Sequence, residues 1–295
     1  MTYSHVPVML AEILKYLDPH PGQKFIDGTL GGAGYTLALA EKVGEQGKII
    51  GIDLDELAIN NASQEIKLRK LNNIVLVQDN FKNLKQVVAA NFPAGANFAG
   101  IVFDLGLSSA QLDDEVRGFS FKGERPLDMA FGPINDNSTE QIINQYPLLD
   151  LVRVFRDYGE ERRAYQIAKE IVAARRVKKL TTTADLVTVI EKAVPFRFRS
   201  KIHPATKIFQ ALRMETNQEL KALEEVLPQA VDLLCPHGRL VVVSFHSGED
   251  RIVKRFLKAS GQLQVLTKRP DVPTTREIAD NPRARSAKLR AAMKV

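Results

Sequence analysis

The fold is decided by one stretch near the N-terminus, KFIDGTLGGAGY at residues 24–35. Its apolar start, residues 24–26, predicts a short strand that ends at Asp27. The glycines that follow let the backbone turn tightly and let a ligand approach closely. Residues 36–43 then predict a helix. A strand, a glycine-rich turn and a helix in this order indicate an α/β fold with a ligand site at the turn.

The same alternation continues along the chain. Further strands are predicted at 48–52, 74–77 and 99–103, and a helix at 56–70. Strands that alternate with helices indicate a parallel sheet. Each early strand ends near an aspartate, and the four are Asp27, Asp53, Asp79 and Asp104. One such aspartate is typical of a turn or a helix cap. Four in register favour a binding site, because α/β sheets bind ligands at the carboxyl ends of their strands.

The pattern changes after residue 138. Residues 138–190 show only helical periodicity, and the signal Thr183-Ala184-Asp185 predicts the start of one helix. The helices are expected at 148–158, 160–175 and 183–191. A long helix is expected at 204–234, followed by a strand at 239–245.

These elements predict one α/β domain that is interrupted by a helical insert. The domain comprises residues 1–137 and 204–295, and residues 138–203 form the insert, which we expect to recognise RNA. The basic tail, residues 268–295, is expected to be a disordered arm or a segment that RNA orders.

Composition excludes several classes of protein. The single cysteine, Cys235, excludes an internal disulfide and a cysteine-based zinc site, so no metal is expected. No stretch approaches the roughly 20 apolar residues of a membrane span, and the N-terminus lacks the pattern of a signal peptide. We therefore expect a cytoplasmic protein with no membrane partner. Its net charge of +6 is a weak indication of nucleic-acid binding.

The glycine-rich turn also limits the cofactor. Dinucleotide sites have G-x-G-x-x-G here, but Gly32 and Gly34 would need a third glycine where Leu37 stands. A ligand without a pyrophosphate, such as S-adenosylmethionine, is therefore favoured over NAD. Asp53 ends the second strand, where an acidic residue hydrogen-bonds ribose hydroxyls.

Longer motifs along the chain resemble one family. They are HVPVML (5–10), DGTLGGAG (27–34), FDLGLSSAQLD (103–113), RGFSF (117–121), PLDM (126–129), HPATK (203–207), FQALR (209–213), SFHS (244–247), EDR (249–251), NPR (281–283) and RSAKLR (285–290). The set is similar to the bacterial 16S rRNA cytosine N4-methyltransferases of the small-subunit methyltransferase H (MraW) family. The resemblance implies a Rossmann-like class I S-adenosylmethionine-dependent methyltransferase with a mostly helical insert.

The resemblance also implies a reaction and a site. The reaction is methylation of the exocyclic N4 of a cytidine in the decoding region of 16S rRNA. The partner is 16S rRNA or the assembled small ribosomal subunit. The sequence does not determine the oligomeric state, for which a homodimer is one alternative. The implied cofactor contacts are Ala33, Gly34, Tyr35, Asp53, Phe81, Asp104 and Gln111. The chain departs from the family pattern at Tyr35 (usually His), Ala110 (Pro), Ala130 (Arg) and Gly248 (Leu).

Three residues are candidates for the chemistry. Asp104 either accepts a hydrogen of the target amine or binds the cofactor. Ser108, with Ser109, either hydrogen-bonds the base or caps the following segment. His246 either contacts the target base or its phosphate or is structural.

Other side chains are candidates for RNA contact. Phe119 and Phe121 either stack on a base or pack in the core, and His203 is structural or functional. The clusters at 197–201 and 283–290 either contact phosphates or form a solvated face.

Two other functions compete with rRNA methylation. A methyltransferase of the same fold acting on DNA or protein is one of them. A non-catalytic RNA-binding or assembly module that kept the fold is the other.

Overall fold

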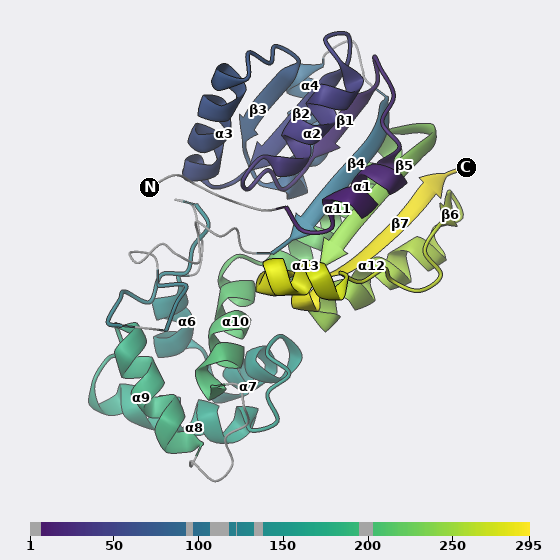
Figure 1. Cartoon of the computed structure of the whole chain (residues 1–295). Helices are drawn as coiled ribbons and strands as arrows, with labels where there is room; N and C mark the ends of the chain where they lie inside the picture. Colours follow the sequence, from purple (N-terminus) through teal and green to yellow (C-terminus); the bar gives the residue numbers. More distant parts are fainter. Residues whose placement is uncertain (1–6, 93–96, 107–117, 122, 133–137, 195–202) are drawn as a thin grey trace. The chain divides into compact units, whose positions relative to one another are not determined.

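The computed structural model describes residues 7–92, 97–106, 118–121, 123–132, 138–194 and 203–295. The chain divides into two compact units (Figure 1). Residues 1–108 and 220–295 form the first unit, which contains the sheet, and residues 109–219 form the second. No helix among the described residues is long and apolar enough to span a bilayer.

The first unit is built on a seven-stranded sheet in the order β3-β2-β1-β4-β5-β7-β6. The strands are β1 (Lys24–Asp27), β2 (Lys48–Asp53), β3 (Ile74–Gln78), β4 (Phe98–Leu105), β5 (Leu234–Ser244), β6 (Leu263–Val265) and β7 (Lys288–Lys294). The first five run parallel, and β7 is antiparallel to both of its neighbours. This mixed sheet confirms the predicted Rossmann-like class I fold and the four early strands.

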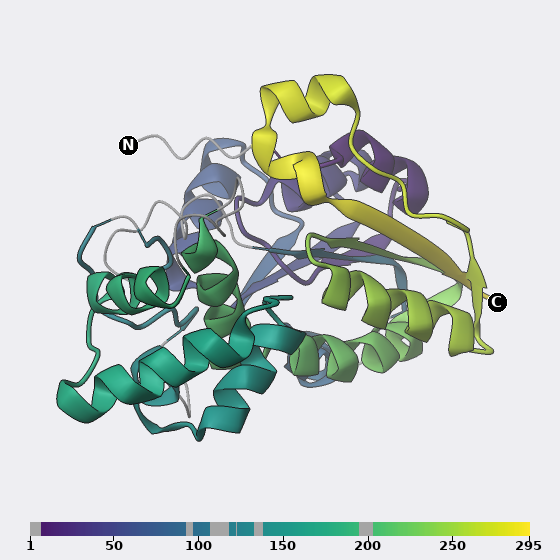
Figure 2. The same cartoon turned by 90° about the horizontal axis from the view of Figure 1, so that it is seen from below.

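Helices cover both faces of this sheet. They are α1 (Leu10–Leu17), α2 (Gly34–Val43), α3 (Glu56–Leu68), α4 (Leu84–Asn91), α11 (Glu219–Leu233), α12 (Ser247–Ala259) and α13 (Thr275–Asp280), with short 3₁₀ turns η1 (Phe81–Asn83) and η3 (Pro282–Ser286). Alternate residues of β5 point to opposite faces. Leu240 and Val242 pack in one core with α4, α11 and α12, whereas Val241 and Val243 pack in the other with α1, α2 and η3. Figure 2 shows α12 and α1 on opposite sides of the sheet.

The second unit is helical in its described part after residue 138. Its helices are α6 (Thr139–Gln145), α7 (Leu148–Asp157), α8 (Ala164–Val177), α9 (Thr183–Ala193) and α10 (Pro204–Thr216). Their shared core includes Leu151, Ile171 and Ile208, all fully buried. Helix α9 starts at Thr183 as predicted, and the residue that caps it is Thr182, which forms a capping box with Asp185.

Two expectations for the second half of the chain are wrong. The single helix predicted at 204–234 is divided into α10 and α11, because Asn217 ends α10 and Gln218 has a left-handed φ of 49°. The tail predicted as an arm is folded, since it contains α13, η3 and β7. Leu289 and Ala291 of β7 are fully buried.

Candidate functional site

The four aspartates lie along one rim of the sheet. Asp27 and Asp53 are the last residues of β1 and β2, and Asp79 directly follows β3. Asp104 is the penultimate residue of β4, where it pairs with Val243 of β5. Because these strands are parallel, their carboxyl ends meet at the same edge, where this class of sheet binds its ligands.

The turn after β1 is shaped for close approach of a ligand. A Cβ at Gly28 would lie 2.3 Å from the ring of Phe103, so this position has room only for glycine. Gly31 and Ala33 have left-handed φ values of 45° and 61°. Helix α2 begins at Gly34, and no side chain caps its first turn. Its uncapped N–H groups, at the positive end of the helix, suit an anionic group of a ligand.

Asp27 holds this turn from inside. Its carboxylate is fully buried and accepts hydrogen bonds from the hydroxyl of Thr36 at 2.8 Å and from the N–H of Thr29 at 3.3 Å. Burial raises its pKa to about 6, and repulsion from Asp53 contributes. Asp27 therefore shapes the turn.

Asp53 joins the turn to the second strand. Its Oδ2 accepts from the N–H of Gly31 at 2.8 Å, and its Oδ1 accepts from the N–H of Asp55 at 2.9 Å. Burial raises its pKa to about 6. Each carboxylate oxygen can accept a second hydrogen bond. Asp53 is partly exposed, so the residue fits the predicted contact with ribose hydroxyls while it also fixes Gly31.

Asp104 has the one unsatisfied oxygen at this rim among the described residues. Its Oδ1 is buried without a hydrogen-bond partner, whereas its Oδ2 lies 3.0 Å from the hydroxyl of Tyr35. Its backbone N–H is held by the hydroxyl of Thr29 at 2.6 Å. Burial raises the pKa of Asp104 to about 7, and repulsion from Asp27 adds to this effect. An orphaned acceptor of this kind is costly unless a ligand supplies the donor.

Tyr35 links Asp104 to the N-terminal segment. Its hydroxyl also lies 2.7 Å from the carbonyl oxygen of Val8. A carbonyl only accepts, and a hydroxyl has one hydrogen to donate. The Tyr35 hydroxyl therefore donates to one of these two acceptors at a time, and its hydrogen bond to Asp104 stabilises the ionised carboxylate and lowers the pKa of Asp104 against the effect of burial. The sequence carried no signal for this connection, because the usual family residue at position 35 is histidine.

The remaining rim residues have structural contacts. Phe81, in η1, packs edge-on against Phe103 with ring centroids 5.8 Å apart. Asp79 accepts from the backbone N–H of Asn80 at 2.6 Å and from the side chain of Asn83 at 2.8 Å. For Asp79 the simpler interpretation, a residue that fixes a turn, is the one the contacts support.

His246 lies at the same rim, at the end of β5. It is the N-cap of α12, and its Nδ1 accepts from the N–H of Gly248 at 3.1 Å. Glu249 completes the capping box by accepting from the N–H groups of Phe245 and His246. These bonds support the structural alternative for His246 through its Nδ1.

The aromatic candidates belong to the second unit, where they pack on protein groups. Phe119 is 7% exposed and stacks on Phe131 at 5.7 Å. Phe121 stacks on His203 at 5.1 Å, and His203 caps α10 while its Nε2 lies 3.1 Å from Glu191. These contacts support the packing alternative for both phenylalanines.

Several candidates have no structural description. Ser108, Ser109 and Gln111, and the basic cluster at 197–201, lie outside the described residues. Within the cluster at 283–290, the predicted phosphate contact is wrong for Arg290. Its guanidinium is buried and bonds the carboxylate of Asp250 at 2.6 Å. Arg283 and Arg285 are exposed.

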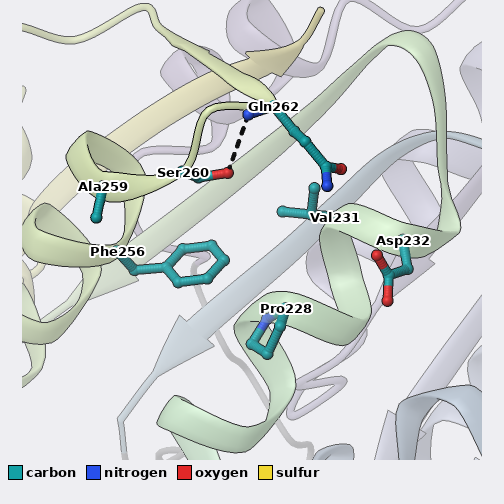
Figure 3. Close-up of a pocket in the computed structure, with 7 residues that line it drawn as sticks. All are labelled: Pro228, Val231, Asp232, Phe256, Ala259, Ser260 and Gln262. Atoms are coloured by element: carbon teal, nitrogen blue, oxygen red, sulfur yellow. Dashed lines mark hydrogen bonds between the residues drawn. The ribbon is translucent and has the colours of Figure 1, made fainter.

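A shallow pocket of about 250 Å³ lies away from this rim, between α11 and α12 (Figure 3). Its lining residues are Pro228, Val231, Asp232, Phe256, Ala259, Ser260 and Gln262. The carboxylate of Asp232 is engaged by Lys85 at 2.6 Å. None of the predicted site residues lines this pocket, and among the described residues no group of His, Cys, Asp or Glu could hold a metal ion.

Comparisons with known proteins agree with this geometry. The family model of the MraW methylase family matches residues 2–295. Two curated relatives are named ribosomal RNA small subunit methyltransferase H. The one from Heliobacterium mobile is 42% identical over all of both chains, and the one from Deinococcus radiodurans is 46% identical over 98% of this chain and 89% of its own length.

A solved structure shows the same fold at lower identity. It is a candidate rRNA-methylase from Clostridium thermocellum, 16% identical, with a TM-score of 0.50 over 99% of this chain and all of its own. Because the family model covers nearly every residue, the chain belongs to the MraW methylase family, which confirms the predicted family and the predicted class of enzyme, a methyltransferase that uses S-adenosylmethionine.

Proposed function

We propose that this enzyme methylates the exocyclic N4 of a cytidine in the decoding region of 16S rRNA. The acceptor class, rRNA of the small subunit, is supported by the names of relatives that match almost the whole chain. The N4 position and the decoding region are supported by the resemblance of the sequence motifs. The structural observation that carries the proposal is the buried, unpartnered Oδ1 of Asp104 at the ligand rim.

The charges of the rim fit the proposed methyl donor. Asp27, Asp53 and Asp104 all have pKa values raised by burial, and Asp27 repels each of the other two. A site with three crowded carboxylates favours a cationic ligand, because a nearby positive charge stabilises their ionised forms. The methyl donor carries such a charge on its sulfonium sulfur. Its carboxylate suits the uncapped start of α2.

The chain's own residues supply position and electrostatics. When bound, S-adenosylmethionine provides a methyl group activated by the sulfonium. Asp53 would hold the ribose hydroxyls, and Gly28 and Gly31 keep the backbone close enough for contact. Asp104 Oδ1 is placed to accept a hydrogen bond from an N–H group. Of the two groups that could donate it, an amino group of the cofactor and the target amine, we favour the amino group of the cofactor.

The target amine sets a further requirement. The lone pair of a cytosine N4 is delocalised into the ring, so an acceptor for one of its hydrogens would orient it and help to remove a proton as the new bond forms. Asp104 in its ionised form is one candidate for this acceptor. Ser108 and His246 stay predictions for contact with the base.

Methyl transfer measured directly tests the proposal. Radiolabelled S-adenosylmethionine would be offered with small ribosomal subunits and with naked 16S rRNA, and the modified nucleoside would be identified by mass spectrometry. We expect N4-methylcytidine in at least one of the two substrates. Absence of label in both, with cofactor binding demonstrated by calorimetry, would contradict the proposal. Absence of cofactor binding would favour a non-catalytic RNA-binding module.

A further inference from the structure

One face of α12 carries four cations at helical spacing. They are Arg251, Lys254, Arg255 and Lys258, at positions i, i+3, i+4 and i+7, and we call them the α12 basic stripe. Residues with this spacing lie on one side of a helix. All four are exposed. Among the residues that the structure describes, none of the four has an ion-pair or hydrogen-bond partner.

The acidic residues of α12 do not neutralise the stripe. Glu249 is 3% exposed and accepts backbone N–H groups at the start of the helix. The carboxylate of Asp250 forms a salt bridge with the guanidinium of Arg290 at 2.6 Å and a longer one with the ammonium of Lys288 at 4.0 Å. Elsewhere in the first unit an exposed cation such as Lys85 is paired. The stripe is therefore an uncompensated band of positive charge.

The opposite side of α12 anchors the helix. Val253 and Leu257 are buried in the core on this face of the sheet, and Phe256 packs against the same core. Figure 3 shows Phe256 beside Pro228 and Val231 of α11. The apolar side thus faces the sheet and α11, and the stripe faces away from both.

The position of α12 connects the stripe to the ligand rim. Helix α12 starts three residues after β5, whose last residue, Ser244, pairs with Leu105 of β4 directly beside Asp104. A Cβ at Gly106 would lie 3.0 Å from the ring of Phe245, so the two chain segments that leave these strands are in contact. Arg251 lies about one turn into the helix, and Lys258 lies about 10 Å farther along its axis. The stripe therefore begins near the rim and leads away from it.

We propose that the α12 basic stripe binds the phosphates of the RNA strand that presents the target base. In a B-form duplex each strand carries a phosphate about every 3.4 Å of the helix axis, so at this spacing a stripe about 10 Å long spans about three phosphates. Lysine and arginine at one-turn intervals, free of acidic partners, are suited to such contacts. The proposal rests on RNA as the substrate and adds the path that the strand takes from the rim.

A charge-neutralising variant tests the stripe. The variant R251Q/K254Q/R255Q removes three exposed cations, and K42Q/K67Q/K70Q is the matched control. Lys42 and Lys67 lie near the C-terminal ends of α2 and α3, and Lys70 lies just beyond α3. Because both helices start at the rim, these three lysines lie at the ends of the helices that are far from it. All three control lysines are exposed. Both variants change the net charge by the same amount, so an effect confined to the first cannot come from net charge.

Two measurements are made on each variant. Fluorescence anisotropy with a small-subunit rRNA fragment, without cofactor, gives RNA affinity as a function of salt, and calorimetry gives the affinity for S-adenosylmethionine. For the stripe variant we expect RNA affinity to fall about tenfold or more. We expect the slope of log affinity against log salt to become shallower by about 2, since each phosphate contact on a single strand contributes about 0.7. Cofactor affinity and the unfolding midpoint should not change.

Several results would overturn the proposal. One is an equal loss of RNA affinity in the stripe and control variants, and another is an unchanged salt slope. Stripe-dependent binding to anionic phospholipid vesicles that exceeds binding to RNA would assign the surface to a membrane. Because anisotropy needs no turnover, wild-type protein that binds RNA through the stripe but transfers no methyl group would refute the proposed reaction and leave the stripe supported.

Discussion

Replacing Asp104 by Asn should stabilise the free enzyme while it weakens cofactor binding. The side chain is partly exposed, but its Oδ1 is buried without a partner. Burial raises its pKa from 3.8 to about 7. A rise of this size means that the ionised form opposes folding by at most about 4 kcal/mol at pH 8. Asparagine keeps the shape and a contact with Tyr35 but carries no charge.

The sign of the pH dependence follows from the direction of the shift. Between pH 4 and pH 7 the folded wild type holds the Asp104 proton that the unfolded chain has lost. Wild-type stability therefore falls as pH rises through this window, and the contribution is constant above pH 7. The Asn variant lacks this pH-dependent contribution to stability, because the asparagine side chain does not titrate. About 2–3 kcal/mol of the difference between the two proteins should develop between pH 5 and pH 8.

Thermal unfolding at several pH values measures this difference. At about 2 °C per kcal/mol for a chain of this size, the Tm advantage of Asp104→Asn should be about 4–6 °C larger at pH 8 than at pH 5. Asp250→Asn is the control with the opposite sign, because it leaves the buried guanidinium of Arg290 without its carboxylate partner. A Tm difference for Asp104→Asn that does not vary with pH, or a variant less stable than wild type at pH 8, would refute the reasoning.

Three further changes give separate expectations. Tyr35→Phe removes the hydroxyl between Val8 and Asp104. It should cost about 1–2 kcal/mol of stability and move the pH midpoint of cofactor binding upward, and calorimetry across pH that finds the same midpoint would contradict this. Asp53→Ala should weaken cofactor binding at least about tenfold but leave RNA affinity nearly unchanged, so equal losses in the two titrations would argue against the ribose contact. Gly28→Ala places a methyl group against the Phe103 ring and should cost about 1–3 kcal/mol in chemical denaturation, whereas an unchanged midpoint would show that the ring moves freely.

Much of the fold was predictable because local patterns and tertiary structure agree in the first hundred residues. There, each strand is a short apolar run that ends at or next to an aspartate, and β1, β2, β3 and β4 all occur where this pattern places them. The predicted and observed elements differ where the local sequence signal was weak. Asn217 ends α10 and Gln218 has a left-handed φ before α11 begins, but no glycine or proline marks this break in the sequence. In the tail, the charges of Lys288 and Arg290 concealed a strand in which Leu289, Ala291 and Ala292 are buried.

The residues of the site could be predicted from the sequence, but most of the hydrogen bonds between them could not. Asp53 and Asp104 were identified from their places at strand ends, and both lie at the ligand rim. Their hydrogen bonds to Gly31 and to Tyr35 depend on how the turn folds back over the sheet. The role of Arg290 was misassigned because its partner, Asp250, is forty positions away in the sequence and adjacent in space.

The place of β7 in the sheet has a consequence for how the protein is made. This strand lies between β5 and β6, yet it is synthesised after both. Until residues 288–294 have left the ribosome, β5 and β6 each lack a neighbour, and unpaired strand edges promote association between chains. A nascent chain that stalls before β7 would therefore expose unpaired edges of β5 and β6, and these edges would be sites of association with other chains.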